Sequence, residues 1–169
     1  MEDSVAIKQA VNTIGSLIKD PSKGLPEGIF LLVSRLTPMI NVDLLLKNKR
    51  GQTLLTWRDD GYWKAGWHVP GGIIRYKETI EERIQAVAKA ELGAEVEFLA
   101  IPLAFNEIIH QERRDRGHFI SLLYQCSLTT PPDESLRYRS GRPRPNQWKW
   151  HTKCPENIIK VHEIYRKYI

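Results

Sequence analysis

The sequence predicts an α+β fold in which helices flank a mixed β-sheet. Helix-like and strand-like stretches are interspersed, but they do not follow the regular strand–helix–strand alternation that is typical of a parallel sheet. The chain has 169 residues, of which 41% are hydrophobic, and this is enough to bury the core of one domain. Without a repeat or interdomain linker, we expect residues 25–169 to form a single domain behind an N-terminal helix and linker at residues 1–24.

Composition and charge favour a cytoplasmic protein. No apolar run is long enough to span a membrane, and the first residues lack the pattern of a secretory signal. Cys126 and Cys154 are far apart without metal-type spacing, so we expect both to stay reduced. The net charge of +5 is compatible with nucleic acid, but a nucleotide substrate or solubility explains it as well. We therefore expect neither nucleic acid nor a membrane as a partner.

The N-terminal region predicts two helices. Residues 4–19 have an amphipathic helical pattern, and residues 20–24 break it with Pro and Gly. Pro26 is suited to the first turn of a second helix that runs to about Leu36. The residues that share the apolar face of the first helix are Ile7, Val11, Ile14 and Ile18.

The next segment predicts three strands. Residues 40–47 and 53–58 are strand-like, and the turn at 48–51 between them suggests a hairpin. Residues 67–70 predict a short strand that leads into the glycine pair Gly71-Gly72, which we expect to open a loop.

A helix is predicted at about residues 79–92. Thr79 and Glu82 have the spacing of a capping box, and Gly93 fits a left-handed C-terminal stop.

The C-terminal half predicts strands at 95–111 and 118–128, joined by a turn at 114–117. Residues 129–147 are rich in Pro and Arg and predict a loop before a short strand at 147–151. Pro155 predicts the start of a final helix. Its apolar stripe is formed by Ile158, His162, Tyr165 and Ile169.

Glu91 is the strongest candidate for a site residue. On an ideal helix it is in line with Ile80, Ile84 and Val87, at the end of the buried stripe. It also lies in the last turn, where the helix dipole disfavours a negative charge, so its carboxylate needs a cation. An Arg or Lys partner, or simple exposure, would meet that need. With the glycine pair upstream, a divalent metal such as Mg²⁺ is the functional alternative.

The glycine pair and the acidic residues before the helix also have two interpretations. Pro-Gly-Gly is a common turn, whereas glycines also permit a close approach of the backbone to an anion or metal. For the three acidic residues at the helix start we favour capping and dipole stabilisation over metal binding. These acidic residues are Glu78, Glu81 and Glu82.

This region resembles the Nudix box, G-x5-E-x7-R-E-U-x-E-E-x-G-U, where U is a bulky apolar residue. Four positions agree in register: Gly72, Glu78, Glu91 and Gly93. Three others depart from the pattern: Ala86, Val87 and Ala90. A cluster of three carboxylates therefore cannot form in this box.

The reduced box is similar to that of the GDP-mannose mannosyl hydrolase branch of Nudix hydrolases, which keeps only the last Glu in an Ala-Glu-Leu-Gly sequence. Arg58 precedes Trp67 by nine residues, as in that branch, and residues 69–72 read Val-Pro-Gly-Gly. Residues 42–43 fall on the first strand of that branch, and the tail around Trp150 is also similar. The resemblance covers all but the first 22 or so residues.

The resemblance implies a Nudix-type α/β/α sandwich that hydrolyses a nucleoside diphosphate sugar with Mg²⁺, releasing nucleoside diphosphate and free sugar. It implies that the Gly71 carbonyl and the Glu91 carboxylate hold the metal and that Gly72 lies against the substrate. Arg58 would contact the diphosphate and neutralise its growing charge. Phe30 falls where the branch has a Phe near the nucleotide, although a core role is the alternative. The resemblance also implies a homodimer. The N-terminal helix lies outside the resemblance, and we expect it either to strengthen a dimer contact or to cover a sheet edge.

The chain departs from the branch at its catalytic loop. Where the branch has a metal-binding Gln and a basic His, this chain has Arg144-Pro145, and Gln147 would need a re-routed loop to replace the ligand. Replacement bases are His110, which we favour, His118 and His68. Arg144 belongs to a basic group that would close over the phosphates or remain a solvated loop; its other members are Arg137, Arg139 and Arg142.

The missing base leaves three functions open. The first is hydrolysis of a nucleoside diphosphate sugar at the sugar carbon with a rearranged base. The second is a Nudix pyrophosphatase that attacks phosphorus. The third is a catalytically weak protein that binds nucleotide sugars.

Overall fold

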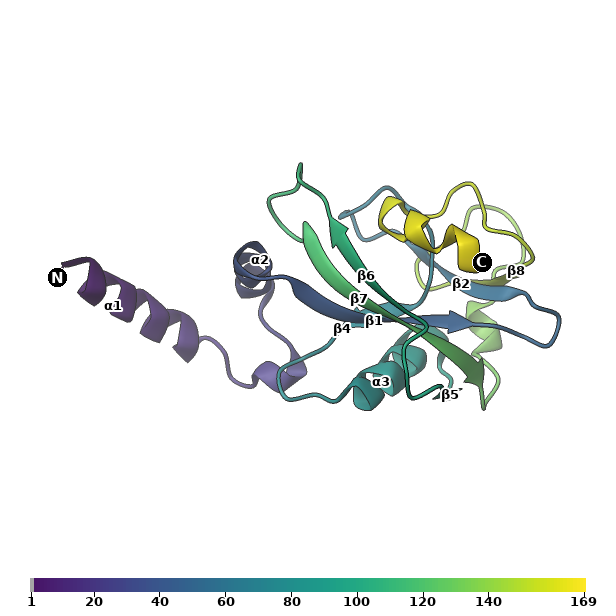
Figure 1. The fold of residues 1–169 in the computed structure, drawn as a ribbon, viewed down its shortest axis with the longest axis horizontal. Coiled ribbons are helices and arrows are strands. Elements are labelled where there is room, and N and C mark those ends of the chain that lie inside the picture. Colours follow the sequence, from purple (N-terminus) through teal and green to yellow (C-terminus); the bar gives the residue numbers. More distant parts are fainter. Residues whose placement is uncertain (1) are drawn as a thin grey trace.

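The computed structural model describes residues 2–169, with side chains from Ser4 onward, and Figure 1 shows its helices and strands. The α-helices are α1 (Glu2–Ser16), α2 (Glu27–Leu36) and α3 (Ile80–Leu92), and the 3₁₀ helices are η1 (Pro21–Lys23), η2 (Glu134–Leu136) and η3 (Lys160–Tyr168). The strands are β1 (Met39–Leu46), β2 (Thr53–Arg58), β3 (Gly66–His68), β4 (Gly71–Ile73), β5 (Val96–Phe98), β6 (Ala104–Ile109), β7 (His118–Leu128) and β8 (Trp148–His151).

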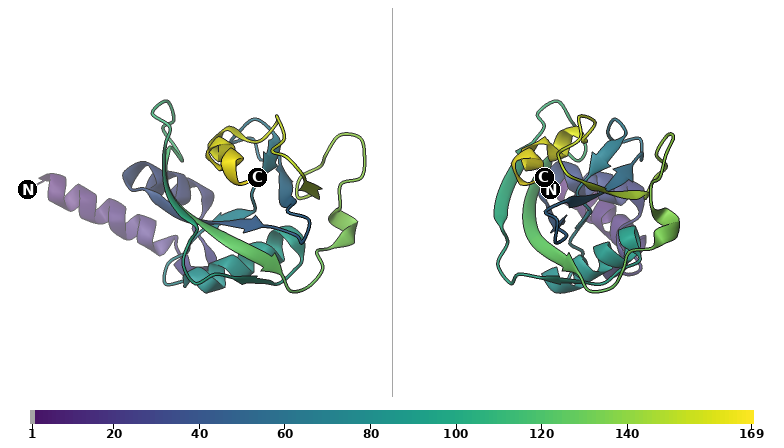
Figure 2. Two further views of the ribbon diagram at one scale, coloured as in Figure 1. Left: turned by 45° about the vertical axis from the view of Figure 1, so that its right-hand side comes forward. Right: turned by 90° about the vertical axis from the view of Figure 1, so that its right-hand side faces the viewer.

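A five-stranded mixed sheet forms the centre of the molecule. Its order is β4-β1-β7-β5, with β6 also paired to β7; β1 and β7 are parallel and the other pairs are antiparallel. Helix α3 covers one face, and a three-stranded sheet, β3-β2-β8, lies with η3 on the other side (Figures 1 and 2). The predicted α+β sandwich is therefore confirmed, with a second sheet that the sequence did not reveal.

The alternation of side chains along β1 explains the two halves of the core. Val42 and Leu44 face α3, where they pack with Ile84. Leu45 faces the other side and packs with Tyr165 of η3. Because both faces of β1 are buried, its sequence is almost continuously apolar.

The predicted hairpin of residues 40–47 and 53–58 is wrong. Both strands form, but β1 and β2 belong to different sheets and are joined by a single bridge between Lys47 and Thr53. Strand β1 already has β4 and β7 at its two edges, so β2 pairs with β3 and β8 instead. The turn at 48–51 thus connects two sheets.

Three further differences concern element boundaries. The expected strand 95–111 is in fact two strands, β5 and β6, and both pair with β7. They are separated by a break at residues 99–103. This break contains Pro102, which has no N–H to donate to a sheet. The glycine pair is not a loop but part of β4. The final helix is a 3₁₀ helix and begins at Lys160 rather than near Pro155; buried His162 and Tyr165 have the three-residue spacing of that helix type.

The local signals at α3 are confirmed. Thr79 and Glu82 form a complete capping box, and Gly93 ends the helix with a φ of 63°. These ends fix the register of α3 and therefore the direction in which Glu91 points.

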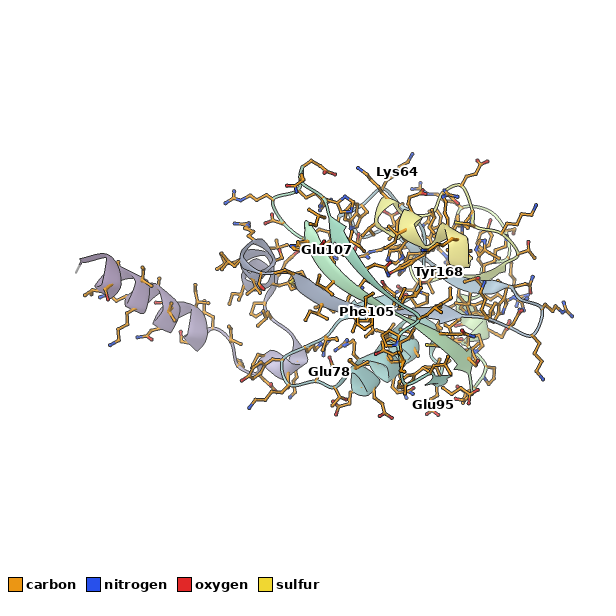
Figure 3. The ribbon with its side chains drawn as sticks, in the orientation of Figure 1. Lys64, Glu78, Glu95, Phe105, Glu107 and Tyr168 are labelled. Carbon is orange, nitrogen blue, oxygen red and sulfur yellow. The ribbon has the colours of Figure 1, made fainter. Side chains whose placement is uncertain are left out.

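The predicted N-terminal helix is present as α1, but it does not cover a sheet edge. It projects away from the rest of the molecule, and its side chains stand clear in Figure 3. No helix within residues 2–169 combines the length and apolar character needed to cross a membrane. The two cysteines, Cys126 and Cys154, are unpaired.

Candidate active site

The Glu91 carboxylate is held by neutral donors in the last turn of α3. Its Oε1 atom accepts a hydrogen bond from the Gly71 backbone N–H at 3.0 Å, and its Oε2 atom accepts one from the Thr56 hydroxyl at 2.6 Å. His68 Nε2 lies 3.5 Å from Oε2. Among the described side chains, no lysine or arginine pairs with Glu91, although its side chain is only 17% exposed. This arrangement fixes a carboxylate without neutralising it.

Gly71 presents its backbone to Glu91 because of its place in β4. The Leu44 N–H donates to the Pro70 carbonyl and the Ile74 N–H donates to the Ile40 carbonyl. Gly71 is opposite Asp43 between these bonds, in a non-hydrogen-bonded position of the ladder. Its N–H and C=O therefore point to the free edge of β4, on the side of Glu91.

Packing is the reason that both positions are glycine. A Cβ atom on Gly71 would meet Asp43 Oδ1 at 2.1 Å, and one on Gly72 would meet Val87 Cγ2 at 2.8 Å. The space beside both residues is thus already occupied by the protein, so close packing requires glycine at both positions.

Two buried, neutral histidines lie next to each other here: His68 is beside Glu91, and the His162 ring is 5.7 Å from the His68 ring. His68 Nδ1 lies 2.8 Å from the Val69 carbonyl, so it carries the proton. Its Nε2 atom lies 2.9 Å from the oxygen of Thr56, whose single hydroxyl hydrogen is donated to Glu91. His162 Nδ1 accepts the Val69 N–H at 3.0 Å, so its proton is on Nε2. Burial lowers the pKa of His68 and holds the pKa of His162 well below its ordinary value.

Asp43 is a site residue that the sequence reasoning missed. It is buried in β1, and its Oδ2 atom accepts hydrogen bonds from the hydroxyls of Ser121 and Tyr165. Its Oδ1 atom lies beside Gly71 and 4.0 Å from His162 Nε2. Burial raises the pKa of Asp43 to about 6. The sequence signal that could have identified Asp43 is an acidic residue in the middle of a mostly apolar strand.

Two adjoining pockets surround these groups. The Glu91 pocket, of about 260 Å³, is lined by Glu91, Asp60 and Asn146, among other residues. The Asp43 pocket, of about 190 Å³, is lined by residues that include Asp43, Asn41, Trp63, Arg116, Phe119 and His162. Both pockets are lined by Arg58, His68 and Gly71, so they lie side by side.

Arg58 stands where the two pockets meet. Its Nε and Nη2 atoms contact Asp60 Oδ2 at 2.7 and 2.6 Å, and a quarter of its side chain is exposed. Asp60 thus orients a guanidinium that still reaches the pocket surface.

The structure brings Gly71, Glu91 and Arg58 together, with Gly72 beside them, but it separates the other predicted residues from this group. His110 packs against Trp63 with ring centroids 4.8 Å apart and has no hydrogen bond to Glu91. Phe30 packs in the core cluster that contains Met39.

His118 and the basic loop also lie apart from Glu91. His118 Nε2 lies 3.4 Å from Glu107. Arg144 lines a different pocket, and its backbone N–H donates to the Gln147 side chain, which is therefore not aimed at Glu91. The loop reaches the Glu91 pocket through Pro145 and Asn146 rather than through its arginines.

Of the acidic residues at the start of α3, Glu82 has the capping role that was expected, whereas Glu78 forms an ion pair with Arg83 instead. Both oxygens of Glu78 bind Arg83, at 2.7 and 2.6 Å, and Glu82 completes the capping box. Within residues 2–169, no group of three or more His, Cys, Asp or Glu side chains is arranged to hold a metal ion. A metal at Glu91 would therefore depend on backbone, water and substrate oxygens.

Comparisons with known proteins show the family and support the fold. The model of the NUDIX domain matches residues 37–153. The low-salt glycan biosynthesis protein Agl8 of Haloferax volcanii is 26% identical over 111 residues, which cover 64% of this chain and 70% of that protein. The MutT NUDIX hydrolase of Burkholderia pseudomallei has a similar fold, with a TM-score of 0.63, 18% identity, and coverage of 79% of this chain and 98% of that one. The structure of a UDP-X diphosphatase is also similar, with a TM-score of 0.57 and 14% identity. The match covers 99% of this chain and 77% of the diphosphatase chain.

Proposed function

Because this chain belongs to the NUDIX family, we propose that it catalyses Mg²⁺-dependent hydrolysis of a nucleoside diphosphate sugar, similar to GDP-mannose, to nucleoside diphosphate and free sugar. The observation that carries this proposal is the Glu91 carboxylate, which is fixed by Gly71 and Thr56, lacks a basic partner and lines a pocket beside Arg58. The relative that is named for glycan biosynthesis supports a substrate that contains a sugar.

The residues at Glu91 fit a magnesium ion. Each carboxylate oxygen accepts one hydrogen bond from the protein and keeps a further lone pair, and the Gly71 carbonyl points to the same side. Mg²⁺ commonly uses one or two carboxylates, several waters and substrate phosphates. When bound, the ion would supply positive charge to the phosphate oxygens.

Arg58 supplies the second positive charge of the proposed mechanism. A departing diphosphate gains negative charge in the transition state, and an oriented guanidinium stabilises that charge more than the charge of the ground state. Asp60 holds Arg58 in place, so little reorganisation is needed as the bond breaks.

Asp43 is the group that we assign as the base. The hydroxyls of Ser121 and Tyr165 fix one of its oxygens, and the other lies beside Gly71 and His162 at the pocket. A pKa of about 6 leaves Asp43 mostly ionised at neutral pH and able to accept a proton from water. The alternative base from the sequence, His110, stays a prediction without a contact to this group.

Hydrolysis in heavy-oxygen water, at fixed Mg²⁺, tests the site of attack. We expect the label in the sugar and none in the released nucleoside diphosphate. Label in a phosphate would instead establish the pyrophosphatase alternative, in which water attacks phosphorus. The absence of turnover with a panel of nucleoside diphosphate sugars would favour a protein that only binds them.

Two properties accompany this proposal. A homodimer is supported by the exposed apolar face of α1, which has no partner within the described chain. A cytoplasmic location rests on the two unpaired cysteines.

A further inference from the structure

Arg116 is a buried arginine whose position suits a ligand-binding role. It lies in the turn between β6 and β7, is 9% exposed, and adopts a φ of 54°, which is uncommon for a residue with a side chain. Its guanidinium is 4.1 Å from the centre of the Tyr62 ring and 5.7 Å from that of Phe30. Its backbone N–H donates to the Ser34 hydroxyl. These contacts hold the side chain at the Asp43 pocket, which it lines.

Among the described residues, Arg116 has no carboxylate of its own. Among the described side chains, no carboxylate forms an ion pair with Arg116, and its Nε atom is buried without a hydrogen-bond partner. The negative charge of Asp60 favours the charged form of Arg116, but Asp60 is already bound by Arg58. An arginine does not lose its proton in a protein, so burial without an anion is unfavourable and requires a reason.

A second arginine makes the same pocket more positive. Arg58 also lines the Asp43 pocket, and the two guanidinium groups repel each other, so the charge of Arg58 lowers the pKa of Arg116 together with burial. One carboxylate, that of Asp60, serves both arginines. An anion that binds between them would relieve the repulsion and supply the missing hydrogen-bond acceptors.

We infer that Arg116 and Arg58 form a clamp for the substrate diphosphate, in which Arg116 binds the phosphate farther from Glu91. This inference rests on the proposed function. Arg58 lines both pockets, whereas Arg116 lines only the one that Glu91 does not reach, so a diphosphate that begins at Glu91 passes Arg58 before it reaches Arg116. A planar guanidinium suits two phosphate oxygens, and stacking on Tyr62 presets its plane. Tyr62 is itself held by its hydroxyl, which donates to Glu27 at 2.6 Å.

Binding of GDP and UDP at fixed Mg²⁺, measured by calorimetry, tests the clamp without requiring turnover. In Arg116→Met, which keeps the length and the contact with Tyr62, we expect at least about tenfold weaker binding of both diphosphates. The melting temperature should stay equal or rise, because an uncompensated buried charge is removed. The matched control is Arg114→Gln, which removes one charge from an exposed position in the same turn and should change the affinity by less than about twofold.

Two results would overturn the inference. The first is unchanged diphosphate affinity in Arg116→Met, and the second is a wild type that binds neither GDP nor UDP. Wild-type protein that binds diphosphate through Arg116 but hydrolyses no nucleotide sugar would sink the proposed activity and leave the clamp intact.

Discussion

Glu91 is the residue on which the proposed activity depends most. Replacing it with Gln keeps the size of the side chain and an acceptor oxygen for Gly71 or Thr56, but removes the charge that would hold a cation. We expect Glu91→Gln to lower turnover at least about a hundredfold, the scale of losing an electrostatic group of the transition state. The measurement is release of nucleoside diphosphate under saturating Mg²⁺. Full activity in a folded variant would refute the metal assignment.

Arg58 should affect the rate more than the binding of substrate. The charge on the leaving diphosphate grows only as the bond breaks, so Arg58→Ala should lower kcat more than it raises KM. Asp60→Asn is the matched control, because it removes the carboxylate that orients Arg58 and leaves the guanidinium in place. Its effect should be smaller and in the same direction. A rise in KM alone for Arg58→Ala would make Arg58 a ground-state binder.

Asp43 should make the stability of the protein depend on pH. Burial raises its pKa from the model-compound value of 3.8 to about 6, so the folded state binds the proton more tightly than the unfolded state does. This contribution to the free energy of unfolding is fully present below about pH 3.8 and is lost as the pH rises through 6. The loss is up to about 3 kcal/mol, since one pKa unit corresponds to about 1.4 kcal/mol.

Comparison of wild type with Asp43→Asn isolates this contribution by chemical denaturation between pH 4 and 8. Relative to the variant, wild type should lose stability across about pH 4–6. His68 and His162 act in the opposite direction, because their lowered pKa values cost stability as the pH falls below about 6.5, but both proteins share them. Parallel curves for the two proteins would show that Asp43 does not titrate as described.

At the scale of elements, β4 joins the Glu91 pocket to the Asp43 pocket through a contact that only glycine permits. A Cβ atom on Gly71 would meet Asp43 Oδ1 at 2.1 Å, so Gly71→Ala must displace Asp43 or the strand. We expect Gly71→Ala to destabilise the protein by about 1–3 kcal/mol, the range for overpacking. In an Asp43→Ala background the cost should be smaller, because the obstructing oxygen is gone. A double-mutant cycle of unfolding free energies measures this coupling, and additive effects would contradict it.

Also at the scale of elements, the sequence predicted the features that depend on nearby residues but not those that depend on distant ones. Helix α3 has its start and stop signals in nearby residues, so its ends followed from Thr79 and Gly93. Strands β1 and β2 were also located, but their pairing was not, because the choice of partner depends on β7 and β8, far along the chain. Tertiary pairing overrode the local hairpin signal of the turn at 48–51.

At the scale of the whole molecule, the candidate site likewise has parts that local sequence predicted and parts that depend on distant segments. Glu91 and Gly71 lie on one helix and its preceding strand, so their proximity was predictable from a short stretch of sequence. Asp43 and Arg116 meet Arg58 only because β1, the β6–β7 turn and β2 converge on one pocket. No spacing along the chain reports such convergence, and for that reason only histidines were considered as the base from the sequence and Asp43 was not.

Helix α1 provides the last test, at the scale of the assembly. Ile7 and Val11 share one face of α1 and are each about 60% exposed, and the helix projects away from the domain (Figure 1). If this face is the contact of the proposed homodimer, a charge on it should abolish the dimer, since burying each side chain contributes about 1.5–3 kcal/mol. We expect wild type to be a dimer and Ile7→Glu/Val11→Glu to be a monomer by light scattering, with an unchanged melting temperature of the domain. Gln9→Glu, on the opposite side of the helix, should remain a dimer. A monomeric wild type would contradict the homodimer, and a dimer that survives in the double variant would place the contact elsewhere.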